Sequence, residues 1–291
     1  MSLGTLCISI DLELAWGTWD KPTADNDARC AAHEREVVRR LLALFDDHQV
    51  STTWAIVARL LERDPSRPRS DELWYAPDLI DQIRAARTAQ EIGSHSYAHL
   101  YFGQTDREAL RADLWAAKRV HDRHGLAFTS FVFPRNQVAH LDLLREVGIK
   151  VFRSVDRGWH MTARNRLGTT AGRLANLADK LLPLPPATVT PVDHGDLVEL
   201  PSSMLLLARR GLRRAVLPQS AVAKAWLGTE RARRRAQIFH LWFHPSNFYY
   251  DMDRQFRTLG AVLQRAARLR DRGELAIQPM NAFAKPDTNQ R

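Results

Sequence analysis

Short apolar runs rich in β-branched and aromatic residues alternate with longer stretches of helical period, and this alternation constrains the fold of the chain more than any other feature. Such βα repeats build a parallel sheet that helices cover. Strands are predicted at residues 6–10, 52–57, 91–94, 129–133, 150–153, 197–200, 238–243 and 275–278. Helices are predicted at residues 34–48, 77–89, 106–124, 139–147 and 254–272. In a chain of 291 residues, this repeat favours a closed or nearly closed α/β barrel over an open sheet, in one domain over residues 1–291.

The helix over residues 106–124 has the clearest predicted ends. Thr105 is expected to cap its first turn, with Glu108 three residues later as the other half of a capping box. Gly125 supplies the left-handed residue that commonly ends a helix.

The positive charge of the chain is concentrated in one segment. The formal net charge is +9 at pH 7, and residues 208–237 hold nine basic residues against one acidic residue, so the rest of the chain is nearly neutral. We expect a basic helical insertion at about residues 204–237. Because this segment also contains apolar residues, it is either a surface for an anionic membrane or a solvated insertion. Nucleic acid is not an expected partner, since no binding motif accompanies the charge.

The two cysteines, Cys7 and Cys30, form neither a disulfide framework nor a C-x-x-C pair. No apolar run approaches the roughly 18 residues of a spanning helix, and the first residues lack a secretion signal. We therefore expect a cytoplasmic protein, which could lie peripherally at the inner face of the membrane. Polar loops at residues 17–32, 63–77 and 158–196 are expected at the rim of a site, and residues 285–291 are expected to fray.

Carboxylates and histidines follow two of the predicted strands. Asp11 and Glu13 lie at the end of the first strand, where period-two alternation points both to one side. His95 and His99 follow the third strand, and on one helical turn this spacing brings both imidazoles within reach of one cation. A lone acid or histidine usually has a structural role. Two histidines with one carboxylate, however, form a metal site that keeps open coordination positions.

Two more strand ends carry candidate side chains. Alternation along the strand at residues 238–243 places His240, Trp242 and His244 on one side. We expect His240, deeper in the strand, to be a hydrogen-bonded core residue, and His244 to be a proton donor. Arg135 follows another strand, where it could orient a carboxylate or bind a substrate oxygen.

Six segments of the sequence, in this order, look like the motifs of the polysaccharide deacetylase (NodB-homology, carbohydrate esterase) superfamily. They are S-I-D-L-E at 9–13, T-T-W at 52–54, H-S-Y-A-H at 95–99, F-P-R at 133–135, V-E-L-P at 198–201 and W-F-H-P at 242–245. The resemblance covers about residues 5–280, and H-S-x-x-H is its most specific element. It implies a distorted (β/α)7–8 barrel and metal-dependent removal of N- or O-acyl groups from sugars.

The resemblance also implies roles for single residues. Asp11 matches the catalytic base of the family, and His244 matches its general acid. His95 and His99 match the metal-binding pair. The second carboxylate of the usual T-F-D-D-G motif is displaced to Glu13, as in the branch that reads D-x-E. Glu13 is thus the expected third ligand of one divalent ion, or alternatively accepts a hydrogen bond from a water on that ion. Zinc is favoured, with cobalt, manganese or iron as alternatives.

The arginine of the family normally precedes its proline by two positions, whereas Arg135 follows Pro134. Residues 154–159 resemble the motif in which an aspartate holds that arginine and a tryptophan lines the acyl pocket. Trp159 and Trp242 are therefore expected to bind the acyl group or the sugar ring.

Together these features predict an N-deacetylase that acts in the synthesis of a cell-surface polysaccharide, such as an O-antigen or capsule. Its substrate would be an acylated sugar linked to a nucleotide or a lipid. One alternative is a deformylase or a metal-free cyclic-amide hydrolase resembling allantoinase. Another is a catalytically inactive carbohydrate-binding protein of the same fold, which the displaced carboxylate and arginine keep open.

Overall fold

The computed structural model describes residues 3–20, 32–63, 72–156, 184–211 and 217–286. Within these ranges, the strands form one sheet with the order β6-β7-β5-β4-β3-β2-β1-β9-β8, and β10 pairs with the start of β1. Every ladder is parallel except the one between β6 and β7. The strands are β1 (Gly4–Leu12), β2 (Thr53–Ile56), β3 (Glu91–Ser94), β4 (Ser130–Val132), β5 (Val151–Ser154), β6 (Val192–Asp193), β7 (Val198–Pro201), β8 (Met204–Leu205), β9 (Ile238–Phe243) and β10 (Leu275–Ile277).

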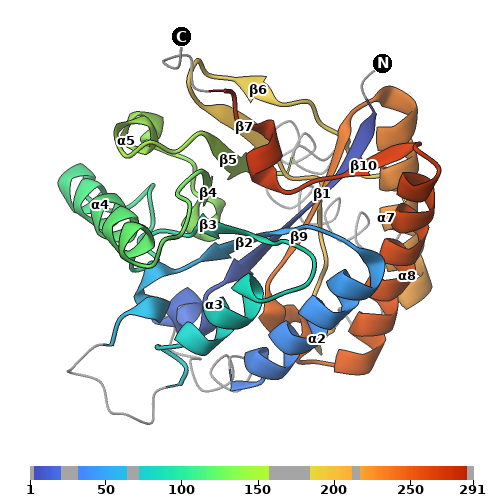
Figure 1. Ribbon diagram of the computed structural model, residues 1–291, viewed down its shortest axis with the longest axis horizontal. Coiled ribbons are helices and arrows are strands. Elements are labelled where there is room, and N and C mark those ends of the chain that lie inside the picture. The colour runs from blue at the N-terminus through green and yellow to red at the C-terminus, as the bar shows by residue number, and fades with distance from the viewer. Residues whose placement is uncertain (1–2, 21–31, 64–71, 157–183, 212–216, 287–291) are drawn as a thin grey trace.

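The sheet curls into an open half-barrel (Figure 1). One continuous segment connects its two ends, because β7 pairs with β5 whereas β8 pairs with β9. Between these strands, the N–H of Ser202 donates to the carbonyl of Ser154, and the N–H of Ser203 donates to the carbonyl of His240. The expected distorted α/β barrel is confirmed. Where β7 gives way to β8, single hydrogen bonds replace a full β-ladder.

Strand β1 runs through the middle of this sheet, and its side chains alternate between two environments. Leu6, Ile8, Ile10 and Leu12 belong to the main apolar core, which the helices share. Cys7 belongs to a smaller core with residues of β2, β4, β5 and β7, inside the curl. Burial raises the pKa of the Cys7 thiol, as expected for a small buried residue. The same alternation turns Ser9 and Asp11 inward.

Helices cover the outside of the curl (Figure 1). The α-helices are α2 (Glu34–His48), α3 (Pro77–Arg84), α4 (Arg107–Arg123), α5 (Leu141–Glu146), α7 (Pro218–Arg235) and α8 (Met252–Asp271). Helix α2 shows why they do so, because its fully buried residues Val38, Leu41 and Phe45 recur every three or four positions and form one apolar face. None of the described helices combines the length and apolarity needed to cross a bilayer.

Three local expectations differ from the structure. The cap of α4 is Asp106, whose side chain accepts from the N–H groups of Glu108 and Ala109, and not Thr105. Residues 204–237 are not an appended insertion in their described part, since β8 pairs with β9 and α7 packs against β1 and α8. Lys285, expected in a frayed tail, donates to Asp193 at 2.6 Å.

Helix α4 contains a histidine that links stability to pH. His121 is fully buried, its Nδ1 lies 2.9 Å from the carbonyl of Ala127, and burial lowers its pKa to about 4. The unfolded chain therefore takes up a proton near pH 6.5, while the folded protein does so only near pH 4. Stability from this group is present above pH 6.5 and is lost as the pH falls towards 4.

We predict that His121→Gln makes the fall in the free energy of unfolding between pH 6.5 and 4 shallower, because the substituted residue does not titrate. Urea unfolding at a series of pH values measures this slope. The exposed neighbour His124→Gln serves as the control and is expected to keep the wild-type slope. Equal slopes for His121→Gln and the wild type would contradict the assignment.

Candidate active site

The carboxyl ends of four parallel strands meet at one edge of the sheet and place the predicted residues together. Strand β1 supplies Asp11 and is followed by Glu13, and His95 directly follows β3. Strand β5 supplies Arg153, and His244 directly follows β9. Because β1 pairs with both β2 and β9, the side chains from these strand ends face one another at the mouth of the half-barrel.

Glu13 lies at the centre of three imidazoles. Its Oε1 is 3.1 Å from His95 Nε2, 3.5 Å from His99 Nε2 and 3.1 Å from His244 Nε2. Burial alone would raise the pKa of Glu13, but His244 and His99 hold it well below its ordinary value. Glu13 is therefore an ionised carboxylate at neutral pH.

The geometry of Glu13, His95 and His99 fits a metal ion. His95 Nδ1 lies 2.8 Å from the carbonyl of Val132, which can only accept, so in the neutral ring Nε2 presents a lone pair to Glu13. Both ring nitrogens of His99 are buried without a hydrogen-bond partner among the described residues, and burial lowers its pKa. Three electron-pair donors within 4.8 Å of one another satisfy the donor set of a divalent ion.

A second possible ligand group, formed by Asp11, Glu13 and His244, suits a cation less well. Both carboxylate oxygens of Asp11 accept from the Arg153 guanidinium, at 2.7 and 2.6 Å. That fixed positive charge opposes a metal ion at the same oxygens. Of the two groups, the one with His95 and His99 is therefore the better fit for a metal ion.

The segment that carries the two histidines is a strained loop and not the helical turn that their spacing suggested. Ser96 and His99 have positive φ angles of 68° and 57°. The buried carboxylate of Asp113, on α4, accepts from the N–H groups of Tyr97 and Ala98, each at 2.9 Å. These hydrogen bonds hold a conformation that non-glycine residues rarely adopt, with the two imidazole rings 5.1 Å apart.

Asp11 forms a buried, bidentate ion pair with Arg153. Burial by itself raises the pKa of Asp11, but Arg153, His244 and His95 bring it below its ordinary value. The Arg153 side chain has no exposed surface, also donates to Ser9 and Asn136, and lies 4.3 Å from the ring centre of Trp242. Asp11 is thereby fixed as a carboxylate that faces the same space as Glu13.

Arg153 orients Asp11, and orienting a carboxylate was one of the two roles that the sequence suggested for Arg135, the other being to bind a substrate oxygen. Arg135 instead donates to Asp20, at 2.9 Å, and stacks 4.7 Å from the ring centre of Tyr101. The turn after Phe133 points it across the mouth, and it still lines the cavity. A signal for Arg153 was present in the sequence, since an arginine inside a predicted buried strand needs a partner.

The other residues predicted from the sequence are His244, two tryptophans and His240. His244 has its pKa raised to about 9, because Glu13 and Asp11 outweigh the lowering effect of burial. Trp242 lines the cavity, and Trp159 lies outside the described residues. His240 is buried, with Nε2 2.9 Å from Ser9 Oγ, and burial lowers its pKa to about 3, so it is the expected core histidine.

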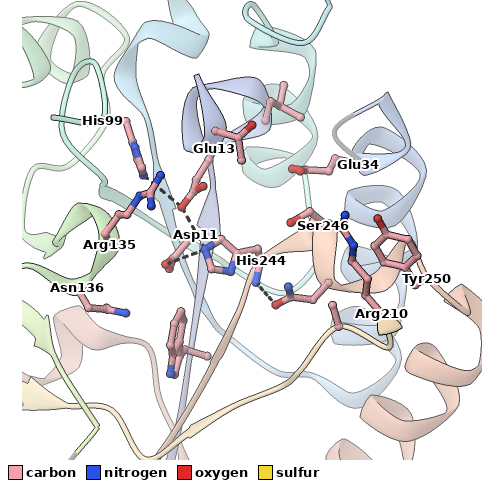
Figure 2. Close-up of a pocket in the computed structure, with 16 residues that line it drawn as sticks. Asp11, Glu13, Glu34, His99, Arg135, Asn136, Arg210, His244, Ser246 and Tyr250 are labelled. Carbon is pink, nitrogen blue, oxygen red and sulfur yellow. Dashed lines mark hydrogen bonds and ion pairs between the residues drawn. The ribbon is translucent and has the colours of Figure 1, made fainter. Parts of the chain in front are cut away.

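These side chains surround a cavity of about 470 Å³ (Figure 2). Asp11, Glu13 and His244 lie between two ends, one with His99, Arg135 and Asn136 and the other with Glu34, Ser246, Arg210 and Tyr250. No role in the site was expected for Glu34 or for Asn136, which follows the candidate Arg135, and the fold brings both to the cavity.

Gly17 lies directly against the carboxylate of Glu13, four residues earlier in the chain. A Cβ at residue 17 would collide with Oε2 of Glu13 and lie 2.7 Å from its Cδ. The flexible carboxylate can move away at little cost in stability, but it then leaves its position between the imidazoles.

We predict that Gly17→Ala lowers zinc affinity by about tenfold or more, while the thermal unfolding midpoint of the metal-free protein changes little. Isothermal titration of zinc into metal-free protein measures the affinity. Gly260→Ala on α8 is the control, because its Cβ would meet only Leu44 at an ordinary 3.6 Å. Unchanged zinc affinity in Gly17→Ala would contradict the assignment of Glu13 as a ligand.

Comparison with known proteins agrees with this fold. Residues 18–151 match a sequence model of the family described as Polysaccharide deacetylase. No curated protein matches the sequence significantly.

Solved structures share the fold. A protein assigned as a polysaccharide deacetylase from Mycobacterium smegmatis has 18% identity and a TM-score of 0.69, over 100% of this chain and 94% of that one. Another from Pseudomonas aeruginosa PAO1 has 13% identity and a TM-score of 0.59, over 94% and 87%. Puue allantoinase has 12% identity and a TM-score of 0.60, also over 94% and 87%. The family model thus matches somewhat less than half of the chain, and these solved structures share its fold.

Proposed function

We propose that this protein is a metal-dependent hydrolase that removes an N-acyl group, in the first instance N-acetyl, from a sugar. The observation that carries the proposal is the convergence of Asp11, Glu13, His95, His99 and His244 on one cavity. This set includes a carboxylate for a base, a protonated imidazole for an acid, and three further donors for a metal. Amide hydrolysis needs all of these functions.

Glu13, His95 and His99 would hold one divalent ion, as a D-x-E variant of the family motif. Mixed nitrogen and oxygen donors suit zinc, which we propose first, with cobalt, manganese or iron as alternatives. Such an ion, when bound, polarises an acyl carbonyl and lowers the pKa of a water molecule.

Asp11 is the proposed general base. Arg153 keeps it ionised and holds both oxygens in place, so it can take the proton of the attacking water without changing its orientation. The cost of burying this carboxylate is offset in advance by Arg153, so the base is ready before substrate binds.

His244 is the proposed general acid. Its raised pKa of about 9 means that it carries a proton at neutral pH. Its Nε2 lies 3.6 Å from Asp11 Oδ2, so base and acid face the same small volume. An amine anion is a very poor leaving group, and a proton from His244 would make its departure feasible.

We also propose a substrate and a biosynthetic role for this protein. An acylated sugar linked to a nucleotide or lipid, used in cell-surface polysaccharide synthesis, fits a cavity with Arg135 and Arg210 at opposite ends, because guanidinium groups bind phosphate well. A cytoplasmic location stays a prediction. A cyclic-amide or formyl substrate is the alternative. Hydrolysis rates on a panel of acetylated sugars, formylated sugars and cyclic amides distinguish these substrates.

We predict that the wild-type protein binds about one divalent ion per chain, and that His95→Ala/His99→Ala binds none. Asp11→Asn is expected to keep the ion and to lose activity by roughly 10²-fold or more, because only the base is removed. Elemental analysis of protein purified without chelator measures the first result, and acetate release from an acetylated-sugar panel measures the second.

His48→Ala, at the far end of α2, is the control for loss of a histidine and is expected to keep both metal and activity. Metal retained in the double variant would reject the site. A wild-type protein without metal after incubation with zinc, cobalt and manganese would favour metal-free hydrolysis or an inactive binding protein.

We also propose that the basic face of α7 and α8 contacts an anionic membrane. A groove of about 650 Å³ between these helices is lined by apolar Leu217, Pro218 and Val222 and by three arginines of α8, including Arg257. Leu217 is 62% exposed. Apolar and cationic side chains together suit a bilayer surface that carries acidic lipids.

We predict that the protein floats with phosphatidylglycerol vesicles at low salt, and less at high salt, but not with phosphatidylcholine vesicles. Leu217→Ser/Arg257→Gln should reduce flotation several-fold. Arg39→Gln on exposed α2, which removes one positive charge elsewhere, should not. Absence of wild-type binding to phosphatidylglycerol vesicles would refute the membrane proposal without affecting the hydrolase.

A further inference from the structure

The end of the cavity away from His99 contains a carboxyl group that the proposed chemistry does not use. Glu34 is the first residue of α2, and only 3% of its surface is exposed, yet it lines the cavity. Figure 2 shows it near Ser246 and Tyr250, in keeping with the contact between α2 and the 3-10 helix Pro245–Phe248.

This carboxyl group is only partly satisfied. The N–H of Leu14 interacts with it, but Oε2 has no hydrogen-bond partner among the described residues. A buried polar oxygen without a hydrogen-bond partner is destabilising, so a ligand that supplies the missing partner gains binding energy. Glu34 is also absent from both groups of possible metal ligands.

The protonation of Glu34 narrows the kind of ligand. Burial and the nearby Glu13 raise its pKa to about 8, so the group exists in both forms near neutral pH. An ammonium ion requires the ionised form, and a carbonyl oxygen requires the protonated form. A hydroxyl group both donates and accepts, and therefore satisfies either form.

We propose that Glu34, with Ser246 and Tyr250 beside it, forms a hydroxyl-binding subsite that holds the sugar ring while the acyl group lies at Glu13 and the histidines. This inference rests on the proposed function and adds the part of the site that distinguishes a sugar from a simple acyl ester. Glu34 is thus a specificity-determining residue and touches neither the proton nor the metal.

The test compares two kinds of substrate on the zinc-loaded, full-length protein. 4-Nitrophenyl acetate carries an acyl group without ring hydroxyls, and the sugar probes are an N-acetylglucosamine pentamer and UDP-N-acetylglucosamine. We expect Glu34→Leu to lower kcat/KM on the sugar by roughly 10- to 100-fold, mainly through KM, and to change 4-nitrophenyl acetate hydrolysis less than about twofold. Glu34→Gln, which keeps a donor and an acceptor, should restore most of the loss.

Glu36→Leu, at an outward position of the same helix, is the matched control and should leave both substrates unaffected. If Glu34→Leu does not fold, Ser246→Ala tests the subsite in its place, since a purely structural role would change both substrates equally. If kcat/KM changes equally for the sugar and for 4-nitrophenyl acetate, or changes for neither, the inference is overturned. Metal-dependent hydrolysis of 4-nitrophenyl acetate without activity on either sugar also overturns it, but retains the metal-centred hydrolase.

Direct binding provides a second measurement if neither substrate is hydrolysed, a result that would reject the proposed function. The same sugars are titrated calorimetrically into Asp11→Asn protein. Sugar binding that disappears in Asp11→Asn/Glu34→Leu supports the subsite independently of catalysis. Sugar binding that is unchanged by Glu34→Leu, or that the Asp11→Asn protein lacks, rejects it.

Discussion

The ion pair between Arg153 and Asp11 is the interaction on which the site depends. It joins β5 to β1 across the inside of the curl, and neither side chain is open to solvent. A buried charge that loses its partner costs about 3–5 kcal/mol, so an apolar replacement of either side chain, which removes its hydrogen bonds as well, carries a large penalty. The same guanidinium holds Ser9 and Asn136, and these contacts tie three strand ends into one polar network inside an otherwise apolar barrel.

Around this network the backbone is strained where the side chains must converge. Leu14, His99, Arg135 and Asn136 have positive φ angles and line the cavity, and Ser96, in the loop between His95 and His99, also has a positive φ angle. Strain of this kind persists only where the surrounding contacts over-determine the conformation. Here those contacts include Asp113 with the histidine loop and Arg153 with Asn136, so the stability of the barrel holds the proposed ligands in place before any ligand arrives.

Much of the fold and about half of the site could be predicted from the sequence. The strands β3 and β9 and the helix α2 have the predicted bounds, because their periodicity is strong. The two-residue strands β6 and β8 were missed, because so few residues show no period. Asp11, Glu13, His95, His99 and His244 were found at strand ends, where parallel topology alone brings them together. Arg153, Asp113 and Glu34 were missed, because their roles depend on which elements pack against one another and not on a local pattern.

The alternation of side chains along β1 gives the polar network a role in folding. A slip of one residue in the pairing of β1 with β9 would turn Ser9 and Asp11 towards the helices and Leu12 towards the interior. Arg153 would then be enclosed without a counter-ion, which is far less favourable than the native arrangement. The charged pair therefore specifies the register of the central strand, and a chain that has paired its strands incorrectly is penalised by residues of the candidate active site.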